Sequence, residues 1–391
     1  MEPSAGRKIH MRCAVADETE HTDVQATREI AVPDHEVISI DIALQGGGAH
    51  GAFTWGVLDR ILEDRRLRID GISGTSAGAM NAVVLADGFS RGGGPSGAQK
   101  ALHAFWKAVS DATRFSPLQR TLLDRLMGRW SMDSSPGYQL FQIAGNLVSP
   151  YEFNPLNINP LRALLARLVD FDRVRACSEL SVFISATNVR TGKARIFRRH
   201  ELDVDKVMAS ACLPQLFQAV EIDGETYWDG GYMGNPALFP LIDETATHDL
   251  IIIQINPIVR DELPRTAAEI INRLNEITFN ASLVREISSI LLLKKLIDEE
   301  RLNRVRYTDM RLHHISGDDE LLRLSVSSKF NAEWAFLEHL HGIGYRAADN
   351  WLGRNFVHLG RKSTLDISSI YFAETGEHMQ TEVTSALHKK T

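Results

Sequence analysis

A serine in a turn of small residues is the strongest chemical signal in this sequence. Ser76 stands at the centre of residues 74–78, GTSAG, which follow a short apolar stretch and precede a run of small residues. A G-x-S-x-G pattern between a strand and a helix is typical of a nucleophile elbow, where a strained turn exposes the serine hydroxyl above the sheet. The helix after it directs its N-terminal amides towards the place where an oxyanion would form. Small-residue turns also occur by chance, so the pattern alone is a moderate signal.

A run of glycines precedes the serine by one predicted helix. Residues 46–48 are three consecutive glycines between a predicted strand at residues 37–44 and a predicted helix at 49–63. With the next predicted strand, at residues 70–73, they form a βαβ unit whose two strands are expected to be parallel neighbours. Both turns then lie at the carboxyl edge of the sheet, where open α/β folds bind ligands. We therefore expect the glycine run to present backbone amides to the group that Ser76 attacks.

The same glycines match a second template. Gly46, Gly48 and Gly51 fit the G-x-G-x-x-G pattern of dinucleotide-binding folds. That template requires an acidic residue at the end of the second strand, whereas residues 72–74 contain none and Asp70 lies at the strand's start. A P-loop does not fit, because no Gly-Lys-Ser/Thr follows the glycines. A dinucleotide- or anion-binding module remains the alternative from another functional class, and a tight turn without a ligand is a weaker alternative.

A serine nucleophile also needs a group that accepts its proton. The chain has 14 histidines, but none stands in a diagnostic setting. Asp229 opens the sequence Asp-Gly-Gly after a predicted hairpin at residues 218–228. A carboxylate can accept the proton directly if its surroundings raise its pKa towards the working pH. In isolation Asp229 is better explained as a turn residue, since Asp-Gly is common turn chemistry.

Together these motifs resemble the patatin-like phospholipase family. The resemblance covers about residues 38–255 and rests on four segments in order: 46–51 (GGGAHG), 74–78 (GTSAG), 209–214 (ASACLP) and 229–231 (DGG). It implies a three-layer α/β/α fold with a mainly parallel central sheet. It also implies a carboxylic ester hydrolase that cleaves acyl esters of lipids with a Ser–Asp dyad, and neither a metal nor an organic cofactor.

The resemblance gives individual residues their roles. It makes Ser76 the nucleophile that forms an acyl-enzyme and Asp229 the base. The oxyanion loop would be Gly46, Gly47 and Gly48, and the supporting positions of the elbow and loops would be His50, Gly51, Gly74, Gly78, Gly230 and Gly231. The family usually has Arg or Lys where this chain has His50, so a permanent cation is replaced by a group that is mostly neutral at neutral pH. This departure leaves the backbone donors in place but puts the charge of the loop in question.

The substrate stays open within this chemistry. A phospholipase A or esterase acting on lipid esters is the first hypothesis. A thioesterase or a depolymerase of polyhydroxyalkanoate-type polyesters would use the same dyad, and an inactive scaffold is a further alternative. We expect a lipid or acyl-ester substrate as the ligand.

The rest of the chain is predicted to build one α/β core. Strands that alternate with helices indicate a mainly parallel sheet with helices on both faces. We expect a polar, flexible tail at residues 1–36, a catalytic core at 37–260 with a helical insertion at about 98–168, an extension packed on the core at 261–361 and a polar tail at 362–391. Residues 89–97 are glycine-rich and are predicted to form a mobile loop. Further strands are predicted at residues 180–188, 194–198 and 250–255 and, more weakly, at 310–315 and 322–326, and further helices at 161–168, 204–212, 267–301 and 331–352.

Composition limits the class of partner and the setting. Hydrophobic residues make up 44% of the chain and its formal net charge is −7, which is typical of a soluble globular protein and argues against a general nucleic-acid binder. Three scattered cysteines indicate a reducing, cytoplasmic setting. The predicted helix at 267–301 is best explained by packing on the sheet or in a homodimer. Its apolar run at 290–293, followed by Lys294 and Lys295, keeps a peripheral membrane contact open.

Overall fold

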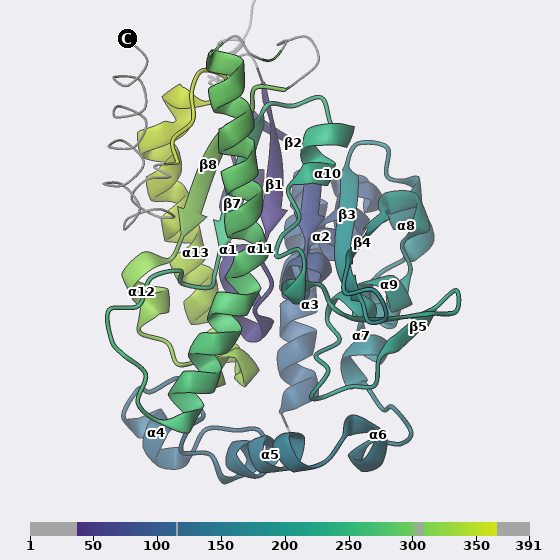
Figure 1. The fold of residues 1–391 in the computed structure, drawn as a ribbon, viewed down its shortest axis with the longest axis vertical. Coiled ribbons are helices and arrows are strands. Elements are labelled where there is room, and N and C mark those ends of the chain that lie inside the picture. The colour runs from purple at the N-terminus through teal and green to yellow at the C-terminus, as the bar shows by residue number, and fades with distance from the viewer. Residues whose placement is uncertain (1–36, 115, 300–301, 303–307, 366–391) are drawn as a thin grey trace, which may run out of the picture. The chain divides into compact units, whose positions relative to one another are not determined.

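One mixed sheet organises the part of the chain that the structure describes (Figure 1). The structure is a computed structural model, and it describes residues 37–114, 116–299, 302 and 308–365. The predicted tail at 1–36 and nearly all of the predicted tail at 362–391 lie outside the described residues. The strand order is β5-β6-β3-β2-β1-β7-β8, and β4 pairs with β3. The strands are β1 (Ile38–Leu44), β2 (Leu67–Gly74), β3 (Ser181–Asn188), β4 (Ala194–Arg198), β5 (Val220–Ile222), β6 (Glu225–Asp229), β7 (Asp249–Gln254) and β8 (Arg311–Ser316).

The centre of the sheet is parallel and one edge is antiparallel. β1 pairs in parallel with β2 and β7, β2 with β3, and β7 with β8. The pairs β3–β4, β3–β6 and β5–β6 are antiparallel. The hairpin of β5 and β6 turns at Asp223-Gly224, where both residues have positive φ. The mainly parallel sheet that the sequence predicts is therefore confirmed.

Helices connect the strands and cover both faces of the sheet. The α-helices are α1 (Gly51–Glu63), α2 (Ala77–Gly88), α3 (Gly94–Thr113), α4 (Leu122–Leu126), α5 (Pro136–Leu147), α6 (Pro150–Phe153), α7 (Pro160–Leu168), α8 (Phe171–Ala176), α9 (Val204–Ser210), α10 (Phe239–Glu244), α11 (Ala267–Asp298), α12 (Asp318–Leu322) and α13 (Trp334–Asn355). Single helical turns lie at η1 (Gly48–His50), η2 (Phe89–Gly93), η3 (Arg199–Glu201), η4 (Gly230–Tyr232), η5 (Val326–Phe330) and η6 (Phe356–His358).

Alternating side chains of the central strands pack into two hydrophobic cores, one on each face of the sheet. Ile42 of β1 and Ile251 of β7 join α1, α2, α3 and α13 on one face. Ala43 and Ile252, one position later in each strand, join α10 and α11 on the other face. Successive residues of a strand point to opposite faces, so a strand that is apolar throughout must be covered on both sides. The described chain is thus a three-layer α/β/α fold, with α11 in front of the sheet in Figure 1.

Two glycines let α13 approach α1 closely. A Cβ atom on Gly56 would lie 1.9 Å from the carbonyl oxygen of His341, and one on Gly344 would lie 2.0 Å from that of Phe53. Any larger residue at either position would force the helices apart. The backbone contact ties the C-terminal helix to the first helix of the core.

Two sequence predictions of local structure are wrong. Residues 89–97 are not a continuous loop, because a π-helical turn, η2, leads into α3 across a kink at Gly92, whose φ is 103°. A Cβ on Gly97 would lie 2.3 Å from the carbonyl oxygen of Gly88, so glycine serves close helix packing here. Residues 322–326 are not a strand but join the end of α12 to η5. Ser328 donates its amide and its hydroxyl to the carbonyl of Ser325, a local bonding pattern that favours a turn over a strand.

Candidate active site

Ser76 occupies a strained turn between β2 and α2. Its φ of 55° and ψ of −119° are rarely adopted by a residue with a side chain, and such strain costs about 1–3 kcal/mol. The turn is tight because a Cβ on Gly78 would lie 2.3 Å from the carbonyl oxygen of Leu44. A Cβ on Gly74 would likewise lie 2.5 Å from the carbonyl oxygen of Gly78. The Ser76 amide donates to Oγ of Ser210, at 2.9 Å.

The glycine loop lies directly against this turn. The predicted neighbouring strands are confirmed, since Leu44 of β1 pairs in register with Gly74 of β2. A Cβ on Gly46 would lie 2.8 Å from the Cβ of Ser76, so only glycine permits the approach. The Gly46 amide is already engaged, because it donates to Oδ1 of Asn235 at 2.7 Å. The amides of residues 47 and 48, by contrast, donate to no described residue.

The strand register brings Asp229 to the level of Ser76. β2 and β3 are in register up to the pair Gly74 and Ile184. Asp229, at the end of β6, pairs with Ala186 of β3. Ala186 lies as far beyond Ile184 as Ser76 lies beyond Gly74, so the antiparallel β6 returns the aspartate to the edge where the elbow lies.

Burial and a small number of hydrogen-bond partners determine the pKa of the Asp229 carboxyl. The residue is 1% exposed, and its Oδ1 accepts the Gly231 amide at 2.7 Å. Its Oδ2 forms no hydrogen bond of normal geometry with any described residue. Burial raises the pKa of the Asp229 carboxyl to about 7, against smaller lowering effects of the Gly231 amide and the nearby Ser76 hydroxyl. A carboxyl with a pKa near neutrality can accept and return a proton, as a general base requires.

Glycines 230 and 231 allow the carboxylate to be covered. A Cβ on Gly231 would lie 1.9 Å from the ring of Phe279 in α11. One on Gly230 would lie 2.1 Å from the carbonyl oxygen of Ser185. The two glycines after Asp229 therefore let α11 and β3 close over it, and this closure dehydrates the acid.

His50 is neutral, so it cannot supply the positive charge that an Arg or Lys would carry at this position beside the glycine loop. Its side chain is buried, and Nε2 lies 2.7 Å from Oγ of Ser328. Burial, helped by the charges of Lys329 and Arg260, lowers the pKa of His50 to about 3. The imidazole ring also lies edge-on to Phe336. The substitution at this position thus leaves the glycine loop without a charge of its own at neutral pH.

Ser76, Asp229 and the three glycines line one cavity of about 510 Å³. The remaining lining is mostly apolar and comes from six stretches of the chain. These contribute Tyr138, Phe141, Gln142, Gly145, Leu213, Gln215, Leu216, Tyr232, Asn256, Ala267, Ile271, Asn272, Asn275, Phe279, Val326, Lys329 and Phe330. Another cavity, of about 600 Å³, lies beyond the carboxyl ends of β7 and β8 beside α13 and holds none of the predicted site residues.

Sequence reasoning missed the side chains that hold the glycine loop. Oδ1 of Asn235 accepts the Gly46 amide, and Nδ2 of Asn256 donates to the Gly46 carbonyl at 2.8 Å. Nζ of Lys329 in turn donates to Oδ1 of Asn256, at 2.6 Å. These residues are far from the loop in sequence and belong to no recognisable motif. Only the proximity of Asn235 to the predicted base, a few positions along the chain, offered a signal.

The described residues contain neither a candidate metal site nor a candidate membrane-spanning helix. No group of three or more His, Cys, Asp and Glu side chains in this part of the chain could hold a metal ion. None of the described helices is both long enough and apolar enough to cross a bilayer.

Comparisons with known proteins connect the sequence to one family. The model of a family described as patatin-like phospholipase matches residues 42–242. VipD from Legionella pneumophila is a similar solved structure, with 14% identity, 78% of this chain and 67% of that chain covered, and a TM-score of 0.34. ExoU–SpcU from the type III secretion system of Pseudomonas aeruginosa is another, with 16% identity, 91% and 78% covered, and a TM-score of 0.27. No curated protein matches the sequence.

Proposed function

The chain belongs to the patatin-like phospholipase family, and on this premise we propose that it is a serine lipid acyl hydrolase of phospholipase A or esterase type. The observation that carries the proposal is the cavity shared by Ser76, Asp229 and the glycine loop. Its lining combines one nucleophile, one acid and free backbone amides with mostly apolar side chains. This is the combination that hydrolysis of an ester with a fatty acyl chain requires.

In the first half of the proposed reaction, Oγ of Ser76 attacks the carbonyl carbon of the ester. Its proton passes to the Asp229 carboxylate, whose pKa of about 7 suits the transfer. The carbonyl oxygen becomes an oxyanion, which accepts hydrogen bonds from the amides of Gly47 and Gly48. The intermediate then expels the alcohol, which takes the proton from Asp229, and the acyl group stays on Ser76.

In the second half, water replaces the alcohol. The water oxygen attacks the acyl carbon while Asp229 accepts a proton from the water. The same amides stabilise the second oxyanion. The bond to Oγ breaks, the proton on Asp229 returns to Ser76, and a free fatty acid leaves. Because the Gly46 amide is held by Asn235, we assign the oxyanion donors to Gly47 and Gly48, and Gly46 serves to bring the loop against the serine.

A lipid surface is the proposed source of the substrate. Helices α5 and α11 contribute lining residues such as Phe141 and Ile271, and the same helices expose Leu140, Leu147 and Leu274 to solvent. An apolar surface continuous with an apolar cavity gives an acyl chain a path that avoids water. We therefore propose peripheral contact with a membrane through these helices.

The alternatives differ in the support that they receive. Thioesters and polyesters remain compatible with the same dyad, and a substrate panel separates them from phospholipids. The dinucleotide-binding alternative gains no support, because the Gly46 amide is bonded to Asn235 and the cavity lining is mostly apolar.

Labelling and turnover of a Ser76→Ala variant test the proposal. We expect a fluorophosphonate to label the wild type at Ser76, and the variant to lose labelling and at least about 10³-fold of its ester hydrolysis. Phospholipid, p-nitrophenyl ester, acyl-CoA and polyester substrates are assayed together. Ser178→Ala, at an exposed serine, is the matched control and should behave as wild type. A folded wild-type protein that is neither labelled nor active on any of these esters would refute the proposal.

A further inference from the structure

One cationic side chain lines the candidate active site. Among the described residues that form the cavity, Lys329 is the only Lys, Arg or His. It lies in η5, far in sequence from the serine and the glycines, and outside the segment that the family model matches.

Lys329 contacts the glycine loop with both its backbone and its side chain. Its carbonyl oxygen would lie 2.6 Å from a Cβ on Gly48. Its Nζ donates to Oδ1 of Asn256, and Nδ2 of Asn256 donates to the carbonyl of Gly46. Because Gly46 packs against Ser76, the ammonium group is joined to the nucleophile through one side chain and one loop residue.

The charge of Lys329 is not neutralised by an ion pair with any described acidic residue. Glu276 of α11 is the acid whose charge acts on it most, but that carboxylate is held by Arg260 at 2.7 Å and by Arg273 at 3.1 Å. His50, on the other side of the loop, is neutral. A buried cation without a counter-ion favours negative charge that develops nearby.

We propose that Lys329 supplies, from the C-terminal segment, the positive charge that position 50 lacks, and that it stabilises the oxyanion formed at the Gly47 and Gly48 amides. The inference rests on the proposed function of the same cavity. It assigns Lys329 an electrostatic role and assigns Asn256 the role of orienting the ammonium group towards the loop.

The proposal makes catalysis depend on the protonation of Lys329. Burial lowers the pKa of Lys329 to about 8, with Arg260 acting in the same direction and Glu276 opposing it. The other titratable groups that face this region are Asp229, His50, Tyr138 and Tyr232, and burial raises the pKa of both tyrosine hydroxyls above its ordinary value. The wild-type rate should rise as Asp229 loses its proton near pH 7 and fall again as Lys329 loses its proton near pH 8.

Two variants at position 329 test the role of the charge. On a neutral p-nitrophenyl ester we expect Lys329→Met to lower kcat about 10- to 100-fold with little change in KM, and to abolish the alkaline fall of the rate. Lys329→Arg should retain most of kcat and move the alkaline fall to higher pH, since a guanidinium stays charged. Lys193→Met, at an exposed lysine in the turn between β3 and β4, is the matched control and should leave kcat unchanged.

Each other outcome overturns the proposal. A loss confined to KM for phospholipids, with the neutral ester unaffected, would make Lys329 a binder of the phosphate head group. Equal partial losses of kcat in the Met and Arg variants, with fluorophosphonate labelling kept, would make its role steric. Loss of all turnover and of fluorophosphonate labelling in both variants would make Lys329 the base that activates Ser76. If Ser76→Ala is inactive and Lys329→Met is not, the proposed function stands without this inference; if the wild type is neither active nor labelled, both fail.

Discussion

At the scale of single residues, the site depends on one dehydrated acid. Asp229 is buried beside Ser76, with one oxygen on the Gly231 amide and the other without a normal hydrogen bond among the described residues. Burial disfavours its charged form and raises its pKa to about 7. The same shift that suits a base makes the folded state bind a proton more tightly than the unfolded chain does. Above the unfolded pKa, near 4, Asp229 therefore costs stability, and the cost grows until the pH passes about 7.

Asp229→Asn should separate activity from stability. We expect ester hydrolysis to fall at least about 10³-fold at every pH, because an amide cannot accept the serine proton. We also expect the Tm at pH 8 to rise by a few degrees and the difference from wild type to vanish below pH 4, since the amide carries no charge to dehydrate. Calorimetry across this pH range and a pH–rate profile measure both effects.

The control for this variant is Asp261→Asn, at an exposed aspartate, which should change neither quantity. An Asp229→Asn protein whose Tm gain is the same at pH 4 and pH 8 would contradict the assigned pKa. An Asp229→Asn protein that keeps wild-type turnover would show that Asp229 takes no part in the reaction.

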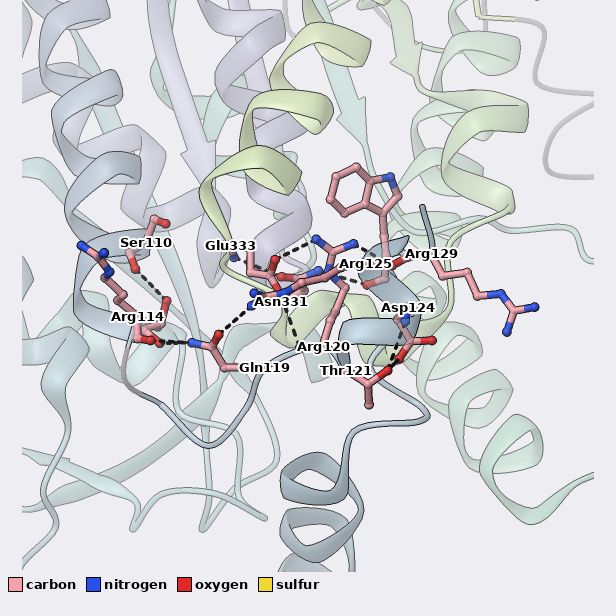
Figure 2. A network of polar contacts seen from close by, with 12 residues as sticks. Ser110, Arg114, Gln119, Arg120, Thr121, Asp124, Arg125, Arg129, Asn331 and Glu333 are labelled. Atoms are coloured by element: carbon pink, nitrogen blue, oxygen red, sulfur yellow. Dashed lines mark hydrogen bonds and ion pairs between the residues drawn. The ribbon is translucent and has the colours of Figure 1, made fainter. Parts of the chain in front are cut away.

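At the scale of elements, a polar network joins the segment before α4 to the start of α13 (Figure 2). Arg120 donates to both carboxylate oxygens of Glu333, at 3.1 and 2.7 Å, and to the carbonyl of Arg129. Asn331 donates to the carbonyl of Trp130, and its Oδ1 accepts the Glu333 amide. The network thus holds the segment that contains Arg120, Arg129 and Trp130 against the segment that follows Lys329.

The two partners of the central ion pair should not contribute independently to stability. Arg120 is 9% exposed, so Glu333→Gln leaves a buried cation with a weaker partner, and we expect a loss of about 1–3 kcal/mol in the free energy of unfolding. Arg120→Met alone should cost a similar amount, and the double variant should cost less than the sum of the two. Denaturant unfolding of all four proteins gives the coupling energy.

The exposed pair of Arg190 and Glu225 supplies the matched double-mutant cycle, for which we expect a much weaker coupling because solvent screens both charges. Additive effects of Arg120→Met and Glu333→Gln would show that the network does not act as a unit.

At the scale of the whole molecule, apolar side chains are exposed on the helices that surround the cavity. Leu140 and Leu147 of α5 are 68% and 78% exposed, and Leu274 of α11 is 57% exposed. In Figure 1 α5 lies at the same end of the sheet as α4 and α6, and the lower end of α11 reaches it. Helices α4 and α6 expose Leu126 and Tyr151. The chain carries a formal net charge of −7, so it has no overall electrostatic attraction to an anionic lipid surface. Burial of apolar area is the available driving force.

Replacing Leu140 and Leu147 together by Ser should therefore affect only substrates at an interface. We expect the rate on zwitterionic phospholipid vesicles to fall about 10-fold and the rate on a soluble short-chain ester to stay unchanged. Vesicle binding by the wild type should be nearly independent of salt. Val357→Ser, at an exposed residue of η6, is the control. Equal effects on vesicles and on the soluble ester would show that the leucines shape the site instead.

The sequence by itself determined the parts of the site that local chemistry encodes. A turn as tight as residues 74–78 accepts only small residues, and a glycine run that follows the neighbouring parallel strand lies at the same edge of the sheet. The serine turn and the glycine run were therefore recognisable without coordinates. The apolar alternation of the central strands determined the layers for the same local reason. The β-hairpin before Asp229 was also predicted, although only the family resemblance gave that aspartate a role.

Only the tertiary structure decided which other side chains surround the serine. Asn235, Asn256 and Lys329 meet at Gly46 and Gly48 because strands and helices distant in sequence converge at one edge of the sheet. It also decided that Gly97, within residues 89–97, lets α2 and α3 pack closely, and that His50 is buried and neutral. A hydrogen bond, a dehydrated carboxyl or a close backbone contact depends on which residues lie opposite in space. The neighbouring residues in the sequence do not determine which residues those are.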